Sequence, residues 1–276
     1  MLSLMDAFIK NAALAHGAYM AALLRVIIGF GLAAPVWLAF RPRWPDAKVL
    51  KVHVKRGVVG AAMALTFFVA LTKLPLAETI AISFIAPIVS LYLAALLLGE
   101  KVRPRAIWGA ALGLVGVVVI VGGKFGRGNL DSDTLTGLAA ISFSAMLYAW
   151  NLVIQREQAL VAKPLEVTVF YMGVAAVCYL FAAPWLFDMP PLSELGDVGF
   201  AAVLTLAGAM TMSWAYARAE AQILVPLEYS SFVWAMLFGW LLLAETVTWT
   251  AIGGAALIVA GCLVATSRKR TEQTAI

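Results

Sequence analysis

The chain has 276 residues, of which 63% are hydrophobic and 13% are charged. Ordinary soluble domains contain about 45–50% apolar and about 25% charged residues, so this composition excludes a water-soluble globular protein. The net charge of +5 is compatible with nucleic-acid binding. Membrane proteins, however, keep Lys and Arg beside the cytoplasmic leaflet, and we favour that explanation over a nucleic-acid partner.

Long apolar runs separated by short polar breaks indicate membrane-spanning helices. A span needs roughly 20 apolar residues, so about ten spans would use roughly 200 residues and leave no room for a soluble domain. In chain order, after a short apolar piece at 1–13, the expected helices cover 18–40, 57–72, 76–98, 104–122, 134–156, 165–187, 197–218, 222–243 and 248–266. The predicted fold is an all-α integral membrane bundle of ten transmembrane helices, the first one truncated.

The first piece is unusual because thirteen helical residues reach only about 20 Å. We therefore expect the natural start of the chain to lie roughly a dozen residues upstream of Met1. The orientation follows from the distribution of basic residues. The run from Arg41 to Arg56 and the tail at 267–276 are rich in Lys and Arg, whereas the opposite loops carry few. A cytoplasmic C-terminus and a bacterial inner-membrane location are predicted.

The two halves of the sequence resemble each other. One register pairs Glu100 with Glu245, and it also pairs two glycines in each half. Because each half contains an odd number of spans, the second half must enter the membrane from the opposite side. We therefore expect two inverted five-helix repeats, at 1–123 and 134–266, followed by a cytoplasmic tail. The glycines Gly109, Gly113, Gly116, Gly254 and Gly261 are expected at close helix crossings.

Four segments, Leu4–Lys10, Leu74–Thr79, Pro87–Glu100 and Pro226–Glu245, resemble the drug/metabolite transporter superfamily in its EamA group. The resemblance covers nearly the whole chain. It implies a ten-span transporter, and the group includes exporters of amino acids and their derivatives, nucleotide-sugar carriers and S-adenosylmethionine carriers. The first two segments are most similar to the S-adenosylmethionine-type branch.

Three ionisable residues in the first two spans are candidate substrate-binding residues. On insertion scales each such group costs about 2.5–3.5 kcal/mol, so each needs a partner or a wet cavity. Asp6 and Lys10 lie one helical turn apart and can neutralise one another, and Arg25 is expected at a similar depth. The cluster is either a structural set of ion pairs or the part of a cavity that meets the charged end of a solute.

A polar stripe on a later span provides a second set of candidates. Tyr148, Asn151 and Gln155 recur on one face of an otherwise apolar helix, which should face the bundle interior. Trp214 and Tyr229 are expected opposite this stripe, where their rings would either stack on a solute or simply pack in the core.

The repeat makes Phe67 the counterpart of Trp214, so we include Phe67 among the binding residues. Pro87 and Pro226 would loosen their spans and form a pair of hinges. His16 and His53 are placed in loops on opposite sides of the membrane. We expect neither histidine to bind a metal, and we expect no cofactor.

Glu228 follows Pro226 and has no obvious basic partner at its depth. A desolvated carboxylate of this kind would bind a proton or a cation, unless Tyr148 or Asn151 simply tethers it by a hydrogen bond.

The leading hypothesis is a secondary active transporter that moves a small organic metabolite by alternating access, with a proton as the candidate coupling ion. The expected solute is an amino acid, an amino-acid derivative or a compound like S-adenosylmethionine. The alternative is an integral membrane lipid-modifying enzyme, which would require clustered Asp or His residues at the membrane interface. The expected partners are the lipid bilayer and the solute, and the protein is expected to be a monomer or a homodimer and not an enzyme.

Replacing Glu228 tests its assignment as the proton-binding residue. In Glu228→Gln, uptake should lose its pH dependence while the fold stays intact, because the amide cannot take up a proton. Initial uptake rates between pH 5.5 and pH 8.5 measure this. Unchanged pH dependence removes Glu228 from the mechanism.

Overall fold

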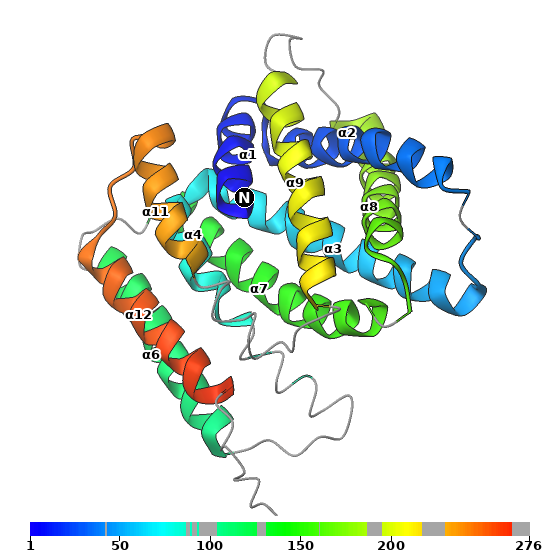
Figure 1. Ribbon diagram of the computed structural model, residues 1–276. Coiled ribbons are helices and arrows are strands. Elements are labelled where there is room, and N and C mark those ends of the chain that lie inside the picture. Colours follow the sequence, from blue (N-terminus) through cyan, green and yellow to red (C-terminus); the bar gives the residue numbers. More distant parts are fainter. Residues whose placement is uncertain are drawn as a thin grey trace, which may run out of the picture.

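The chain is helical in a computed structural model, which describes residues 1–41, 43–86, 89, 93, 104–125, 131–159, 161–186, 195–216 and 230–266. Figure 1 shows the helices packed as a bundle around α1. In chain order they are α1 (Leu2–His16), α2 (Ala18–Ala39), α3 (Ala47–Lys73), α4 (Leu76–Ser83), α6 (Pro104–Phe125), α7 (Ser132–Ala159), α8 (Pro164–Leu186), α9 (Leu195–Tyr216), α11 (Ser230–Leu243) and α12 (Trp249–Thr266).

Five of these helices, α2, α3, α7, α8 and α9, are long and apolar enough to cross a membrane. The prediction of a multi-pass helical membrane protein is therefore confirmed. Two predicted boundaries are wrong. Helix α4 ends at Ser83, although the sequence predicted one helix over 76–98, because the Phe84 and Ile85 amides donate to carbonyl oxygens three residues back and the chain turns there. Helix α3 begins at Ala47, ten residues before the expected start, because Asp46 accepts a hydrogen bond from the Val49 amide at 2.8 Å and caps the helix. His53 consequently lies in a helix and is fully buried, not in a loop.

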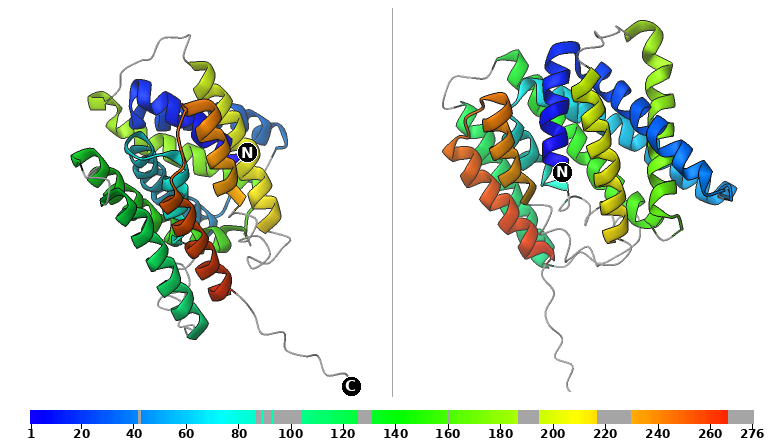
Figure 2. Two further views of the ribbon diagram at one scale, coloured as in Figure 1. Left: turned by 90° about the vertical axis from the view of Figure 1, so that its left-hand side faces the viewer. Right: turned by 45° about the horizontal axis from the view of Figure 1, so that its top comes forward.

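Helices α6 and α12 lie side by side along one edge of the bundle (Figure 2). A Cβ atom added to Gly254 would lie 2.5 Å from the Gly116 carbonyl oxygen, and one added to Gly261 would lie 2.5 Å from the Gly109 carbonyl oxygen. The backbones are therefore in direct contact, as expected for small residues at a crossing. Because the later residue of one helix meets the earlier residue of the other, the two helices run antiparallel.

Helices α1 and α9 also pack antiparallel. The Phe8 and Phe200 rings meet edge to face with centroids 5.0 Å apart, and Asn11 Nδ2 donates to Asp197 Oδ2 at 2.8 Å. A second pair, α3 and α7, has the same arrangement.

The contacts between α3 and α7 run along both helices. Ser144 Oγ donates to the Met63 carbonyl oxygen at 2.9 Å, and Lys73 Nζ lies 2.8 Å from Asp133 Oδ1. The α3 residue number rises as the α7 number falls, which makes this pair antiparallel too.

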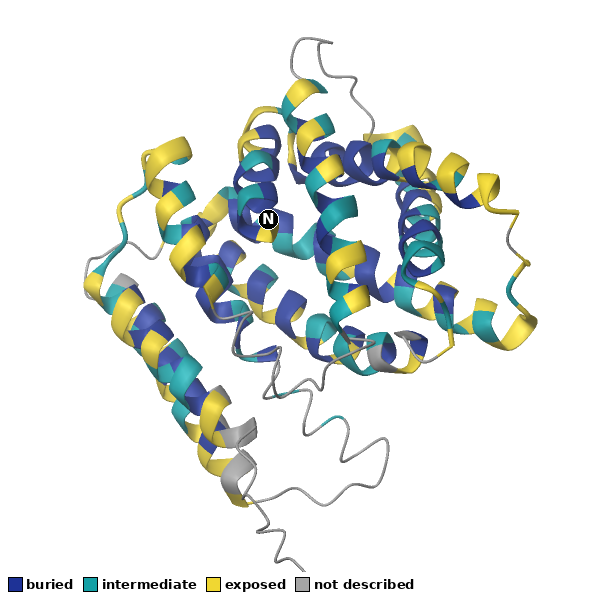
Figure 3. Ribbon diagram, viewed as in Figure 1, coloured by how far each residue is buried: buried dark blue, intermediate teal, exposed yellow. Residues whose placement is uncertain are grey.

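Large apolar residues occupy many of the exposed positions, and Figure 3 marks the exposed positions along each helix. On α8, Phe181 is 80% exposed and Trp185 is 76% exposed, and on α11, Trp240 is 63% exposed. A soluble monomer rarely exposes so much contiguous apolar surface, whereas in a bilayer these side chains contact lipid.

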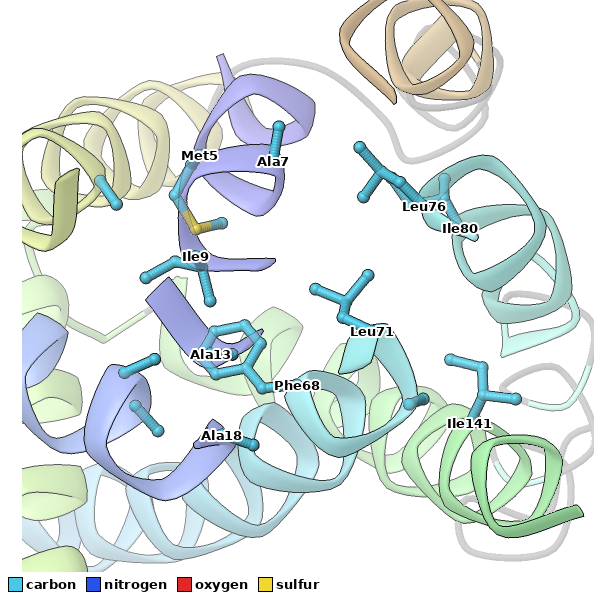
Figure 4. Close-up of a cluster of buried hydrophobic side chains, with 14 of the residues drawn as sticks. Met5, Ala7, Ile9, Ala13, Ala18, Phe68, Leu71, Leu76, Ile80 and Ile141 are labelled. Carbon is cyan, nitrogen blue, oxygen red and sulfur yellow. The ribbon is translucent and has the colours of Figure 1, made fainter. Parts of the chain in front are cut away.

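The interior is formed mainly by α1, α2, α3 and α4. Figure 4 shows Met5 and Ile9 of α1 close to Phe68 of α3, with Leu71 and Leu76 nearby. Ile9 and Leu76 are completely buried. This packing holds the polar residues of α1 in fixed positions between the neighbouring helices.

The close crossing of α6 and α12 predicts different effects for two adjacent glycines. Gly254→Ala should lower the free energy of unfolding by about 1–3 kcal/mol, because its Cβ would overlap the Gly116 backbone. Gly253→Ala is the matched control. A Cβ there meets nothing within 4 Å, so the better helix propensity of Ala should leave stability unchanged or raise it by up to about 1 kcal/mol. Thermal unfolding in detergent measures both. Equal midpoints for the two variants would contradict the close contact.

Candidate functional site

The ammonium group of Lys10 is buried and forms an ion pair with Glu245. Lys10 Nζ lies 2.5 Å from Glu245 Oε1, with side-chain exposures of 6% and 18%. Lys10 Nζ also donates to the Leu74 carbonyl oxygen, between α3 and α4. The sequence suggested Asp6 as the neutralising partner of Lys10, but the structure gives that position to Glu245. The two residues are far apart in sequence, so helical spacing could not reveal the pair.

Local backbone structure holds Glu245 in place. Ala244 has a φ of 51°, in the left-handed region, so the chain turns sharply after α11. The Glu245 amide then donates to the Gly239 carbonyl oxygen at 3.0 Å. Glu245 Oε2 accepts a hydrogen bond from the Leu76 amide at 2.7 Å, at the first turn of α4, where the helix dipole favours a negative charge.

Lys10, Leu74, Leu76 and Glu245 together form what we call the Lys10–Glu245 clamp. It joins α1, the start of α4 and the connection between α11 and α12. Both charges of the clamp are satisfied by charged or backbone groups, so its members have a structural role in this conformation.

Asp6 and Arg25 are two buried charged residues that lie near each other without a direct ion pair between them. Asp6 is 9% exposed and Arg25 is 4% exposed, and the positive charge of Arg25 acts on the Asp6 carboxylate. The Arg25 guanidinium carbon lies 5.1 Å from the centre of the Phe68 ring, close enough for a cation–π interaction. Arg25 Nη1 donates to Thr205 Oγ1 over a long 3.4 Å.

The Nε–H of Arg25 is buried and finds no hydrogen-bond partner among the described residues. A guanidinium carries five N–H donors and binds a carboxylate with two of them. Arg25 therefore has the capacity to hold an anionic group, while Asp6 supplies the opposite charge next to it. Among the predicted residues that the structure describes, this group retains a free donor, and it is the candidate substrate site.

Phe68 and Thr205 belong to this site and were missed by the sequence analysis. The prediction named Phe67, which is half-buried and packs against the main apolar cluster, with its ring 6.1 Å from that of Phe68. The helical face of α3 decides which of the two adjacent phenylalanines faces Arg25. Thr205 lies on α9 and gave no signal beyond being a polar residue in an apolar run.

The polar stripe of α7 faces α3. Asn151 is buried and its Oδ1 accepts from Arg56 Nε at 3.4 Å, while Tyr148 is half-buried beside Ala86 and Ala145. The stripe continues for one more turn to Gln158, which the sequence analysis did not include although its spacing from Asn151 is helical.

Gln158 belongs to a chain of hydrogen bonds that joins α3, α7 and α8. Arg56 Nη1 donates to Gln158 Oε1 at 2.5 Å, and Gln158 Nε2 lies 2.5 Å from His53 Nδ1. His53 Nε2 lies 3.1 Å from Glu166 Oε1, and the His53 ring stacks on Phe170 with centroids 4.6 Å apart. We call Arg56, Gln158, His53 and Glu166 the His53 relay.

The other predicted residues have not been placed at this site. Trp214, near the end of α9, is 53% exposed, and its role in binding stays a prediction. Pro87, Pro226, Glu228 and Tyr229 lie outside the described residues, and their roles stay predictions.

Comparison with known proteins identifies the type of protein. The sequence model of the EamA-like transporter family matches residues 1–122 and 135–267. A solved crystal structure aligns with 95% of this chain and 94% of its own, with a TM-score of 0.64 and 24% sequence identity, which shows a shared fold.

Several curated relatives are transporters. An uncharacterised transporter of Helicobacter pylori is 30% identical over 76% of this chain and 72% of its own. A pseudopaline exporter of Pseudomonas aeruginosa is 27% identical over 78% and 74%, respectively. A riboflavin transporter of Brucella anthropi is 26% identical over 88% and 85%, respectively. These similarities concern the transporter type and do not by themselves assign a solute.

The clamp predicts a large cost for removing one charge. Glu245→Gln should lower the free energy of unfolding by about 3–5 kcal/mol, because the Lys10 ammonium would stay buried without its counter-ion. The double variant with Lys10→Met should recover part of that loss. Asp133→Asn is the control: it breaks the exposed pair with Lys73 and should cost less than about 1 kcal/mol. Denaturation in detergent measures all of these. Equal costs for the two single variants would contradict a buried clamp.

Proposed function

Because the chain belongs to the EamA-like transporter family, we propose that it is a secondary active transporter that moves a small organic metabolite across the bacterial inner membrane by alternating access. The observation that carries this proposal is the buried Asp6–Arg25 pair with its unpaired Arg25 Nε–H. Buried charges inside a membrane bundle are expensive, and those that face the interior commonly mark a substrate pathway.

The charge pattern of the pair supports a zwitterionic solute. Arg25 would bind the carboxylate and Asp6 would attract the ammonium or another cationic group, so each of the two buried charges would gain a direct partner from the solute. Phe68 covers one face of the guanidinium and keeps water away from it. An amino acid, an amino-acid derivative or a compound like S-adenosylmethionine has the required groups.

The names of relatives support the same class. An aromatic amino acid exporter of Ancylobacter novellus is 30% identical over 57% of this chain and 54% of its own. Other relatives are named for pseudopaline and riboflavin. We extend to this chain only the broad class, a small organic metabolite.

Alternating access is supported by the relation between the halves. The sequence register between the halves pairs Gly109 with Gly254 and Gly116 with Gly261. When each residue is replaced by its counterpart, the contact between Gly116 and Gly254 becomes the contact between Gly261 and Gly109, so the two contacts are equivalent by the repeat. The α6 and α12 helices run antiparallel, which is the arrangement that inverted repeats require. The repeat also matches α1 with α7 and α3 with α9. The contact between α1 and α9 therefore corresponds to the contact between α7 and α3. We propose two inverted five-helix units, with the C-terminus in the cytoplasm.

Solute flux tests this proposal. In proteoliposomes, a solute selected by thermal-shift screening of amino acids, nucleosides and S-adenosylmethionine should show saturable counterflow without ATP. Arg25→Gln should lower the counterflow rate at least about tenfold, because the carboxylate contact is lost. Arg25→Lys should retain part of it, and Lys73→Gln, at an exposed position, should leave it unchanged. Absence of flux across the panel, or full activity in Arg25→Gln, would overturn the proposed site.

A further inference from the structure

The His53 relay has only one consistent arrangement of hydrogens. A guanidinium can only donate, so Gln158 Oε1 must accept from Arg56. The amide nitrogen of Gln158 then faces His53 Nδ1, which must accept in turn. The remaining hydrogen of a neutral imidazole lies on Nε2 and is donated to the Glu166 carboxylate. Every polar group along the relay is satisfied when His53 is neutral.

We propose that His53 is a proton-binding site, and that binding of a proton weakens the junction between α3 and α7. The second proton would enter at Nδ1 and place an N–H opposite the Gln158 amide N–H. Gln158 cannot rotate to relieve this, because its amide nitrogen would then face the Arg56 guanidinium. The contact between His53 and Gln158 is therefore lost, while Arg56 keeps its bonds to Gln158 and Asn151 and His53 keeps its bond to Glu166 of α8.

The surroundings of His53 define which charges act on it. From α3, Arg56 faces the relay, and from α8, Glu166 and Tyr171 do so, the Tyr171 ring lying 5.2 Å from the Arg56 guanidinium carbon. The side chains of α7 that face this group, Gln158 and Asn151, are neutral. Phe170 covers one face of the imidazole. A proton on His53 would therefore add a charge to a buried site that already contains a cation.

Protonation of His53 acts on one end of the bundle, because the repeat does not place a second histidine at the equivalent position. The register that pairs Met63 with Met210 also pairs His53 with Phe200. Phe200 packs against Phe8 of α1, and its own side chain cannot take up a proton. If the halves exchange roles during transport, as in the proposed function, protonation of His53 favours opening at the end of the bundle where α3 begins. The inference thus names the proton as a ligand of this transporter.

The protonation state can be observed directly because the chain contains two histidines, His16 and His53. In protein labelled with ¹⁵N-histidine and carrying His16→Gln, the spectrum should show the Nε2–H tautomer at high pH and a doubly protonated ring at low pH. A His53 that stays neutral down to pH 4, or that is the Nδ1–H tautomer, would overturn the proposal. This measurement needs no substrate and no transport.

The weakening of the junction is measured by a distance. Spin labels at Lys51→Cys of α3 and Glu157→Cys of α7, both exposed positions beside the relay, are introduced with Cys178 and Cys262 replaced by Ser. Double electron–electron resonance should show that the mean distance between the two spin labels increases by about 2 Å or more over the pH range in which His53 titrates. A constant distance across that range would overturn the proposal.

His53→Gln provides the matched variant. A Gln side chain can accept from Gln158 and donate to Glu166, as neutral His53 does, but it takes up no proton. The variant should keep the short distance at every pH, and its uptake should change less than about twofold across a range where wild-type uptake changes at least about fivefold. A distance transition or pH profile that survives in His53→Gln, or that is lost only in Glu228→Gln, would contradict the assignment. If no solute is transported at all, the proposed function fails, while the ¹⁵N-histidine spectra still test whether His53 binds a proton.

Discussion

The buried ion pair between Lys10 and Glu245 is the interaction on which the arrangement around α1 depends. It joins two residues from opposite ends of the chain, and the Leu74 carbonyl oxygen and the Leu76 amide complete its hydrogen bonding. In a medium of low polarity, neither charge can be left alone, so the position of α1 is fixed relative to α4 and to the end of α11. Lys10 pairs with Glu245 and not with Asp6, and near Asp6 the Nε–H of Arg25 has no hydrogen-bond partner among the described residues.

The sequence was sufficient to predict the elements but not their partners. Apolar runs bounded by polar residues gave helices close to the observed α2, α6, α8, α9 and α12, because a spanning helix must be long and continuously apolar. The glycines of α6 and α12 were correctly expected at a close crossing. The pairing of Lys10 with Glu245 depends instead on how distant segments pack, which no local spacing can reveal.

The basic residues at the start of α3 show a second limit of prediction from the sequence. Lys48, Lys51 and Lys55 make residues 47–56 look like a polar loop, but on a helix they share the exposed side while His53 faces the interior. The buried face contains a single histidine, too little to produce an apolar pattern. The His53 relay was therefore invisible to hydropathy, even though the neighbouring stripe on α7 was recognised from its period.

The contact between α6 and α12 has a mechanical consequence. At Gly116 and Gly254 the two chains touch through main-chain atoms, which have no rotamers to exchange, so this seam cannot adjust by small repacking steps as ordinary side-chain contacts do. It either stays whole or separates. Among the helix pairs that the structure describes, this one is therefore expected to keep its geometry when neighbouring contacts made by side chains rearrange.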